Sequence, residues 1–246
     1  MSTPEPDYDF PALTEADLPL IRHWLLEPHV SRWWADPPRD TYPDDEVEKY
    51  RLRVRGGDDG TEVFLIRARG RPIGFIQCYR IDDHDEYGEA LALETPAAGM
   101  DLFIGEPAEV GRGHGPRLIR AFLGGVVFAR YDVAECVIGP SVRNANAIRA
   151  YEKAGFRFLK DVVVPDEPDP EHLMCIRRDD AKGDVLPGPR AGHATRYRRP
   201  NSFQTGTLAA IAANRTTVSA APKRVPWRSS KAWPPVASRA MRYSSP

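Results

Sequence analysis

Two ionisable residues of the sequence stand where a proton could be transferred. Asp101 lies between Met100 and Leu102 in a short apolar run that is expected to form a strand. An unpaired charge is costly in an apolar core, so this carboxylate is expected to face a cleft. There it could take a proton from an ammonium group, pass it to water, or only bind the ammonium. The alternative is a carboxylate paired with a structural arginine.

The second residue is Tyr151, three positions after Ile148 in a segment of helical pattern, so both side chains share the face that packs on a sheet. A phenol with an unperturbed pKa near 10 is protonated at neutral pH and could protonate a departing thiolate, whose pKa is about 8.5. The alternative is a tyrosine of the core.

A glycine cluster separates these two residues, with glycines at alternate positions of the segment 111–115, Gly-Arg-Gly-His-Gly. A helical pattern follows from Pro116 to about Arg130. Glycines leave backbone N–H groups uncovered where a helix begins, which favours binding of a phosphate group, and Arg112 could add positive charge. The spacing fits neither a P-loop nor the dinucleotide fingerprint, and the alternative is a tight turn before a helix.

The elements that position these residues form a predicted βαβ unit. Apolar runs at 99–104 and 134–139 are joined by the helix after the glycines, so the two strands should be parallel and the crossover right-handed. A second helix, which contains Tyr151, is expected to begin near Asn144, whose side chain could cap it.

The glycine cluster, followed by N-x-N-A-I-x-x-Y-x-x-x-G-F at 144–156, resembles the acyl-CoA-binding core of the GNAT N-acetyltransferase superfamily. The strand around Asp101 and the segments 103–107 and 149–156 look most like aminoglycoside 6'-N-acetyltransferases. The resemblance covers roughly residues 10–178. It implies an α/β (α+β) GNAT fold, with a mixed, mostly antiparallel sheet, a parallel βαβ core and helices on both faces.

The resemblance also implies a reaction and its site. Acetyl would pass from acetyl-CoA, as co-substrate, to a primary amine of a cationic small molecule, with the 6'-amine of aminoglycosides as the leading acceptor. Asp101 and Tyr151 would be the catalytic base and acid, and a backbone N–H on the strand would polarise the thioester carbonyl. The predicted acetyl-CoA site consists of Leu102, Phe103, Ile104, Gly111, Arg112, Gly113, His114, Gly115, Asn144 and Ala147.

The acceptor is expected to contact Trp34, Tyr79, Asp85, Glu86 and Asp101. Trp34 belongs to an aromatic loop predicted at 29–38 and would form a wall for a sugar ring, whereas Trp33 is expected in the core. The acidic segment 82–89 is expected to be a loop, either simply solvated or forming an anionic lip for a polycation. It lacks the regular alternation and glycine of a calcium loop, and no metal site is predicted.

Two departures from the resembled family bear on the substrate. Val110 stands where a Gln or Arg usually opens the pyrophosphate motif, although the aminoglycoside-type relatives also lack it. Gly139-Pro140 stands where those relatives often carry Asp-Pro, so one anionic contact for an amino sugar is missing. The rival acceptors are the lysine-type amine of a siderophore precursor and a protein amine. The rival outside enzymology is a CoA-fold protein that binds nucleic acid through a basic tail, against which Asp101 and Tyr151 argue.

The remaining elements follow from periodicity and turn residues. Helices are predicted from Thr14 to near Pro28 and at 44–55, and the first should bury Leu18, Ile21, Trp24 and Leu25 on one face. Strands are predicted at 62–68 and 73–81, joined by a tight turn at 69–72, and at 157–164 and 173–177.

Composition indicates the cellular compartment and the state of the cysteines. The 246 residues contain no apolar run of about 18 and no signal-peptide pattern at the N-terminus, so a cytoplasmic protein is expected. Cys78, Cys136 and Cys175 lie in predicted strands and should be small buried hydrophobes rather than disulfides or metal ligands.

Charge divides the chain into two parts. Residues 1–180, the predicted GNAT domain, carry 34 acidic and 22 basic side chains, an excess that would attract a cationic substrate. Residues 181–246 carry one acid and twelve bases and form a predicted disordered tail rich in Pro, Ser and Arg. The tail is either a nucleic-acid-binding segment or, as we favour, a dispensable extension. A monomer and a homodimer both fit the sequence.

Overall fold

The computed structural model describes residues 8–35, 40–57, 59–165 and 167–181. Seven strands form one sheet in the order β1-β2-β3-β4-β5-β7-β6, and every neighbouring pair is antiparallel except β4 and β5. The strands are β1 Tyr8–Asp9, β2 Glu62–Ala68, β3 Arg71–Arg80, β4 Ala97–Ile104, β5 Glu135–Ile138, β6 Arg157–Val162 and β7 Glu171–Arg177. The predicted mixed sheet with a parallel β4–β5 core is confirmed.

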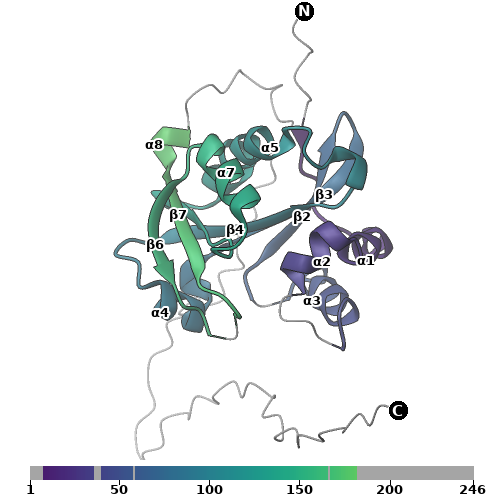
Figure 1. The fold of residues 1–246 in the computed structure, drawn as a ribbon, viewed down its shortest axis with the longest axis horizontal. Helices are drawn as coiled ribbons and strands as arrows, with labels where there is room; N and C mark the ends of the chain where they lie inside the picture. The colour runs from purple at the N-terminus through teal and green to yellow at the C-terminus, as the bar shows by residue number, and fades with distance from the viewer. Residues whose placement is uncertain (1–7, 36–39, 58, 166, 182–246) are drawn as a thin grey trace, which may run out of the picture. The chain divides into compact units, whose positions relative to one another are not determined.

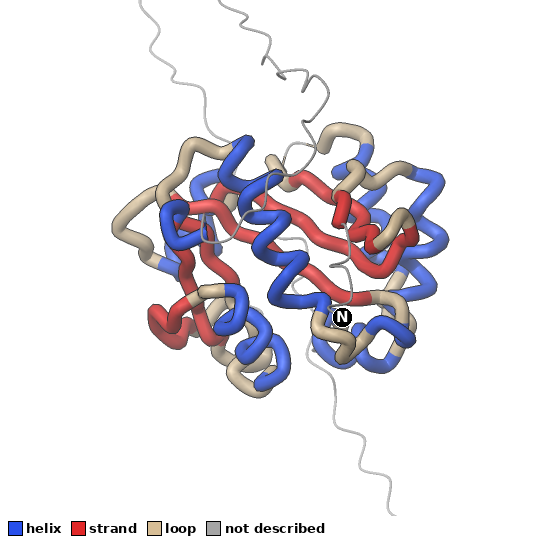
Figure 2. The backbone as a smooth tube through the Cα atoms, turned by 90° about the horizontal axis from the view of Figure 1, so that it is seen from above, coloured by secondary structure: helices blue, strands red, loops and turns tan. Residues whose placement is uncertain are grey.

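Helices cover both faces of this sheet. They are η1 Glu15–Asp17, α1 Leu18–Leu25, α2 Pro28–Trp34, α3 Asp44–Val54, η2 Ile81–Asp83, α4 Asp85–Leu91, η3 Pro107–Glu109, α5 His114–Phe122, the π-helix η4 Leu123–Val127, α6 Phe128–Arg130, α7 Ala145–Ala154 and α8 Arg178–Ala181. In Figure 1, α5 and α7 lie above the sheet, whereas α1–α3 and α4 lie below it on opposite sides. Figure 2 shows helices crossing over the strands from above.

Alternation along the strands assigns side chains to these two faces. Ile76 and Met100 pack with the upper helices in the largest core cluster, whereas Phe75 and Phe103 pack below with α1, α2 and α3. A third cluster, which includes Tyr79 and Leu91, lies between α4 and the sheet. Asp101, two residues before Phe103, therefore belongs to the lower face, between the α1–α3 helices and α4.

The parallel strands β4 and β5 separate near the middle of β4. Their pairing runs from Ala97 opposite Glu135 to Gly99 opposite Val137, although β4 continues to Ile104. Just after the strand, the N–H of Gly105 donates to the carbonyl of Ile73 on β3, with 2.9 Å between N and O. Because N–H directions alternate along a strand, the N–H groups of Leu102 and Ile104 point the other way. Among the described residues, no strand pairs with this side of β4 beyond Gly99, which we call the open edge of β4.

Two predicted loops are helices instead, so both predictions were wrong. The aromatic segment after Pro28 forms α2, with Pro28 in the first turn, where its missing N–H costs no hydrogen bond. The acidic segment forms η2 and α4, with Asp85 and Glu86 in the first turn of α4. Carboxylates are favourable there because the helix N-terminus carries partial positive charge.

Other boundaries shift by a few residues. α5 begins at His114 rather than at Pro116, directly after Gly113, whose φ of +77° places it in the left-handed region. The predicted single helix to Arg130 is interrupted by the π-helix η4. The strands predicted at 134–139, 157–164 and 173–177 are β5, β6 and β7 with the bounds given above.

Several predictions are confirmed closely. β2 has the predicted bounds, α3 ends one residue early, and α1 buries the four expected side chains. The tight turn between β2 and β3 places Arg69 and Gly70 at positive φ. Cys78 and Cys136 are buried, Cys175 is half-buried, and all three are free thiols.

One described residue, Ala181, bears on the predicted domain boundary at residue 180. Ala181, the last residue of α8, is 4% exposed and belongs to the largest core cluster, one residue beyond the predicted domain end. The rest of the predicted tail, residues 182–246, and residues 1–7 lie outside the described part of the chain. None of the described helices is long and apolar enough to cross a membrane.

Candidate active site

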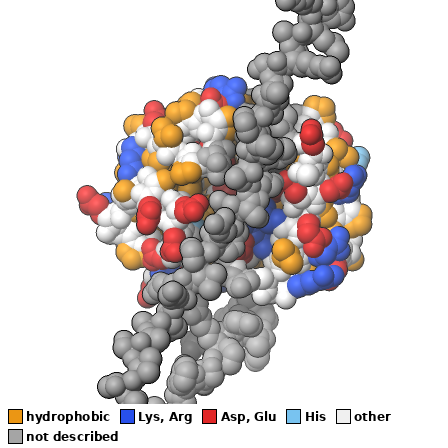
Figure 3. Space-filling model, turned by 90° about the horizontal axis from the view of Figure 1, so that it is seen from below, with side chains coloured by type: hydrophobic (Ala, Val, Ile, Leu, Met, Phe, Trp, Pro, Cys, Tyr) orange, Lys and Arg blue, Asp and Glu red, His pale blue; other side chains and the backbone are white. Residues whose placement is uncertain are grey.

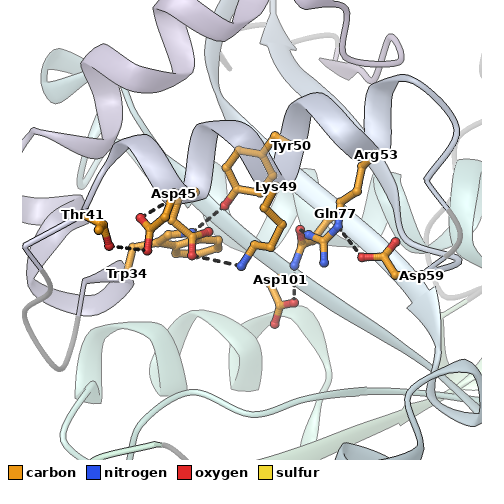
Figure 4. Close-up of polar contacts among 10 residues, drawn as sticks. Trp34, Thr41, Asp45, Lys49, Tyr50, Arg53, Asp59, Gln77 and Asp101 are labelled. Carbon is orange, nitrogen blue, oxygen red and sulfur yellow. Dashed lines mark hydrogen bonds and ion pairs between the residues drawn. The ribbon is translucent and has the colours of Figure 1, made fainter. Parts of the chain in front are cut away.

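Asp101 is held by a row of polar side chains beneath the sheet. Gln77, its register partner on β3, donates a hydrogen bond from Nε2 to Asp101 Oδ2 at 2.8 Å. The same amide accepts a hydrogen bond at its Oε1 from Arg53 of α3, also at 2.8 Å. Arg53 in turn donates to Asp59 at 2.7 Å. Figure 4 shows this chain of contacts running along α3 to Asp101.

The surroundings of Asp101 favour a carboxyl that accepts protons readily. Burial raises the pKa of Asp101 above its ordinary value, and the hydrogen bond from Gln77 and the charge of Arg53 oppose that rise only in part. Among the described residues no arginine forms an ion pair with Asp101, because Arg53 pairs with Asp59 and reaches Asp101 through Gln77. A base with a raised pKa suits proton transfer near neutral pH.

Tyr151 approaches the same place from the upper face. It is 7% exposed, lies in the core cluster of α5 and α7, and packs against Phe156 with 6.0 Å between ring centroids. Its hydroxyl makes no hydrogen bond to another described residue. Burial, and secondarily the charge of Asp101, raise the pKa of Tyr151, so the phenol stays protonated. The two predicted catalytic residues are therefore close enough to interact electrostatically, although they come from opposite layers.

The glycine cluster forms an exposed turn at the N-terminus of α5. Gly111 and Gly113 adopt positive φ values of +74° and +77°, which other residues rarely accept. Side chains built at these positions would meet open space, apart from Arg117 at 3.9 Å from Gly113. Gly115 allows close packing on α7, because its Cβ would lie 3.4 Å from that of Ala150. The backbone N–H groups of this turn have the arrangement that binds phosphate groups.

The predicted cofactor residues in this turn differ in what they can offer. The exposed Arg112 donates to the carbonyl of Ala108 at 3.2 Å and can add positive charge. The imidazole of His114 is buried between Glu109 and Tyr8, at 2.7 Å from the carboxylate and 2.7 Å from the phenol oxygen. His114 can therefore contribute its backbone N–H to a phosphate but not its side chain.

Asn144 is the N-cap of α7, as predicted. Its Oδ1 accepts a hydrogen bond from the N–H of Ala147 at 3.1 Å, so the cap occupies that N–H. Both residues are half-buried, and α7 packs against α5.

The three predicted residues of β4 also differ. Phe103 has its ring stacked on Phe75 below the sheet, and its N–H is directed toward β3, so it offers nothing to the open edge. Leu102 and Ile104 direct their N–H groups to that edge. The carbonyl of Ile104 is already bonded to Nε2 of His29 on α2, at 3.0 Å. The N–H of Leu102, next to Asp101 in the chain, points to that edge and can donate to a carbonyl placed along it.

Together these features fit an extended thioester co-substrate with a pyrophosphate. The turn at 111–115 and the α5 N-terminus offer backbone donors for the pyrophosphate, and the open edge of β4 offers donors for an amide-containing arm. Asp101 belongs to that part of β4, and Tyr151 is close enough to it to interact electrostatically.

On the acceptor side, two predicted aromatic residues are well ordered by packing. Trp34 is half-buried, donates from Nε1 to the Tyr50 hydroxyl at 2.6 Å, and contacts Phe103 edge-on at 4.9 Å between ring centroids. Trp33, expected in the core, is only half-buried and lies outside the core clusters.

Tyr79 is 9% exposed and lies over Gly99, where a Cβ would approach its ring to 2.5 Å. Gly99 therefore leaves room for the phenol beside Asp101.

The predicted acidic contacts lie farther out. Asp85 and Glu86 are exposed on α4, with Asp82, Asp83 and Glu89 nearby, and Figure 3 shows acidic side chains on the α4 side of the lower face. Asp85 lines a surface hollow of about 410 Å³ together with Glu94. These acids give one flank of the lower face negative charge, but no described contact links them to Asp101.

Sequence inspection missed Gln77 and Arg53, which act on Asp101, and Glu171, on which Asp101 acts. Gln77 had a signal, a polar residue in the middle of an apolar strand. Arg53 had none, because a surface helix commonly carries basic residues. Glu171 lies two residues before the strand predicted at 173–177, and its position depends on a strand pairing that the sequence does not reveal.

Comparisons with known proteins agree with this geometry. A family model of the acetyltransferase (GNAT) domain matches residues 14–164. Aminoglycoside N(6')-acetyltransferase type 1 of Klebsiella pneumoniae is 32% identical over 157 residues, which cover 63% of this chain and 77% of that protein. Lysine N-acyltransferase MbtK of a Mycobacterium species (strain MCS) is 25% identical over 170 residues, covering 68% of this chain and 62% of that protein.

Among solved structures, the aminoglycoside acetyltransferase AAC(6')-Ib in complex with coenzyme A and kanamycin is similar, with a TM-score of 0.61 and 30% identity. The match covers 71% of this chain and 96% of that one. The sequence resemblance to the GNAT superfamily is thus confirmed. The chain belongs to the GNAT acetyltransferase family and is an acetyl-CoA-dependent N-acetyltransferase.

Proposed function

We propose that this enzyme acetylates the 6'-amine of aminoglycosides. The observation that carries the proposal is that β4 parts from β5 beyond Gly99, where Asp101 lies on the lower face of the sheet and Tyr151 packs in the cluster on the upper face. A base and an acid on opposite sides of one point suit transfer of acetyl from sulfur to nitrogen. The similarity to aminoglycoside N(6')-acetyltransferases supports this choice of acceptor.

The chemistry needs no covalent enzyme intermediate. Asp101 accepts a proton from the acceptor ammonium, and the amine nitrogen forms a bond to the acetyl carbon. The N–H of Leu102 stabilises charge on the carbonyl oxygen. As the carbon–sulfur bond breaks, Tyr151 donates its proton to the departing thiolate and is later reprotonated from solvent. Because burial makes this phenol a weaker acid, its proton moves only as charge accumulates on sulfur.

The acceptor would be bound by the negative charge of acidic side chains and by the flat face of an aromatic ring. The acidic side chains of the α4 flank would attract a polycation and raise its rate of association. Trp34, fixed by its hydrogen bond to Tyr50, would provide a face for a sugar ring. Tyr79 would contact the acceptor next to Asp101.

A specific observation favours a second acceptor class, a lysine-type amine. The ammonium of Lys49 acts on Asp101 from α3 and pairs at 2.9 Å with Glu46, leaving the Lys49 side chain 47% exposed. A cation at this place would repel a polyamine and attract an acceptor that carries its own carboxylate. The similarity to a lysine N-acyltransferase agrees with this alternative.

A thiol-release assay with acetyl-CoA across aminoglycosides, polyamines and lysine derivatives separates these candidates. Aminoglycosides are expected to give the highest kcat/KM, with the product acetylated at the 6'-amine by mass spectrometry and NMR. Lys49→Ala provides an internal comparison, because it should improve use of a polycation and weaken use of a lysine derivative. Turnover of lysine derivatives alone would overturn the aminoglycoside proposal.

A further inference from the structure

A second carboxylate, that of Glu171, occupies the space that Gly139 leaves vacant and interacts electrostatically with Asp101. Glu171, the first residue of β7, forms an isolated bridge with Ser141 just after β5. A Cβ built on Gly139 would overlap the carboxylate of Glu171. The side chain of Glu171 therefore fills the space that any side chain at position 139 would occupy, so the chain supplies a carboxylate there from a different strand.

The Glu171 carboxylate has a hydrogen-bond donor but no counter-ion. The Tyr87 hydroxyl of α4 donates to its Oε2 at 2.9 Å. No basic side chain in the described ranges forms an ion pair with it. The other ionisable groups that act on it, Asp101 of β4 and Glu167 of the preceding loop, are acidic. Burial and these acids raise the pKa of Glu171 to about 8.

Such a carboxylate is arranged for a cation that arrives with the substrate. A structural carboxylate at this depth would normally be paired with an arginine or lysine, because unpaired buried charge is costly. Here the raised pKa keeps much of the Glu171 carboxyl protonated in the free enzyme near neutral pH, so the cost is met by protonation and would be relieved when an ammonium group lies beside Glu171. Such relief favours acceptors with two separated amines over those with one.

We propose that Glu171 binds a second ammonium group of the acceptor and thereby sets the preference of this enzyme for polyamino over monoamino substrates. This inference rests on the proposed function, because it takes the acceptor to be an amino sugar with several amines. It assigns to β7 an anionic contact that the sequence lacks at Gly139.

The test compares two acceptors and three enzymes. Kanamycin carries several amines, and 6-amino-6-deoxyglucose carries one. In Glu171→Gln, kcat/KM for kanamycin should fall by about 10-fold or more, mainly through KM, with little change for the amino sugar. Glu167→Gln, which removes the same charge from an exposed neighbour, is the matched control and should have little effect on either acceptor. Equal losses for both acceptors in Glu171→Gln would overturn the inference.

A relocated carboxylate gives a second, independent test. Glu171→Ala should lose the preference for kanamycin, and adding Gly139→Asp to it should restore much of that preference, because the new carboxylate enters the same space. Gly139→Asp in the wild-type background should displace the Glu171 side chain and should not raise the preference for kanamycin above that of the wild type. Failure of the double variant to recover, while its thermal unfolding remains cooperative, would contradict the inference.

Thermal unfolding separates binding from a structural role. Since the pKa of Glu171 in the folded protein lies above its ordinary value of 4.5, the folded protein loses stability as pH rises from about 4.5 to about 8, above which the carboxyl is ionised in both states. Glu171→Gln avoids that loss, so its Tm should equal or exceed the wild-type value at about pH 9. A lower Tm for this variant at both about pH 6 and about pH 9 would instead indicate a structural anchor.

The experiments distinguish a wrong function from a wrong role of Glu171. If the wild-type enzyme acetylates neither acceptor, the proposed function fails and this inference fails with it. If the wild type acetylates both and Glu171→Gln behaves like Glu167→Gln, only the role of Glu171 is refuted.

Discussion

The side-chain amide of Gln77 donates a hydrogen bond to Asp101 from directly across the β3–β4 pair, with 2.8 Å between Nε2 and Oδ2. The amide cannot turn around, because Arg53 donates to its oxygen from the other side. Asp101 is thus oriented by a neutral group, while the nearest guanidinium is kept one residue away. A carboxylate held in this way remains available to an ammonium group.

Removing that donor should change how turnover depends on pH. In Gln77→Leu the ionised form of Asp101 loses a hydrogen bond, so the pKa of Asp101 rises further and the acidic limb of kcat/KM moves to higher pH. Activity should fall more at about pH 6 than at about pH 8. Arg53→Met should move the limb in the same direction but less, since its charge is the smaller influence. Parallel pH profiles for wild type and Gln77→Leu would contradict the role of this hydrogen bond.

The base itself is tested by Asp101→Asn. Acetyl-CoA affinity should stay nearly unchanged, whereas turnover of amines should fall by about 10²–10⁴-fold, the usual value of general-base assistance. Asp161→Asn makes the same chemical change on an exposed strand position and should leave turnover intact. Near-normal turnover of Asp101→Asn across the pH range would remove Asp101 from the mechanism and leave deprotonation to solvent.

Tyr151→Phe separates a proton donor from a packing residue, because it keeps the ring and removes only the hydroxyl. A purely structural tyrosine would lose at most about 0.5–1.5 kcal/mol of stability, and this hydroxyl has no hydrogen-bond partner among the described residues. For a proton donor, kcat and kcat/KM should fall together by about 10²-fold or more.

The leaving group provides the control for that variant. An acyl donor with a less basic thiol needs the proton less, so the loss in Tyr151→Phe should shrink with it. Steady-state kinetics with both donors and a melting curve complete the experiment. An unchanged kcat with a lowered Tm would return Tyr151 to the core.

The domain boundary is tested by truncation. A chain that ends after Ala181 should fold and keep its kcat/KM, because the residues beyond it have too little apolar content to extend the core. A chain that ends at residue 177 should be less stable, since it lacks Arg178, which donates to the carbonyls of Phe128 and Tyr131 at 2.7 Å. A drop of more than about tenfold in kcat/KM for the first truncation would show that the tail takes part in the enzyme.

The parts of the fold that the sequence predicted well are those governed by local pattern. β2 is a short continuous apolar run that ends at a glycine turn, and α3 repeats its apolar residues at helical spacing, so their bounds were nearly correct. α2 escaped prediction because its aromatic residues and flanking prolines are typical of a loop, whereas the helix is stabilised by packing on Phe75 and Phe103. Tertiary contacts override local preference in such short helices.

The residues of the candidate site also differ in whether local sequence pattern or tertiary contacts reveal them. Asp101 stood out because a carboxylate in an apolar strand requires an explanation, and Asn144 because its position at a helix start has a known use. The contacts of Gln77 with Asp101 and of Glu171 with Tyr87 depend on strand register and on elements 24 and 84 residues apart. Such pairings are decided by how the whole sheet assembles, which no short window of sequence contains.

The open edge of β4 has a consequence for hydrogen exchange in the free enzyme. Amide protons of Asp101 and Phe103 point toward β3 and should exchange slowly with deuterium, whereas those of Leu102 and Ile104 face no strand and should exchange quickly. Protection should therefore alternate residue by residue along a single strand. Saturation with coenzyme A should slow the fast members of that series, so occupancy of the edge could be followed in the absence of any acceptor or turnover.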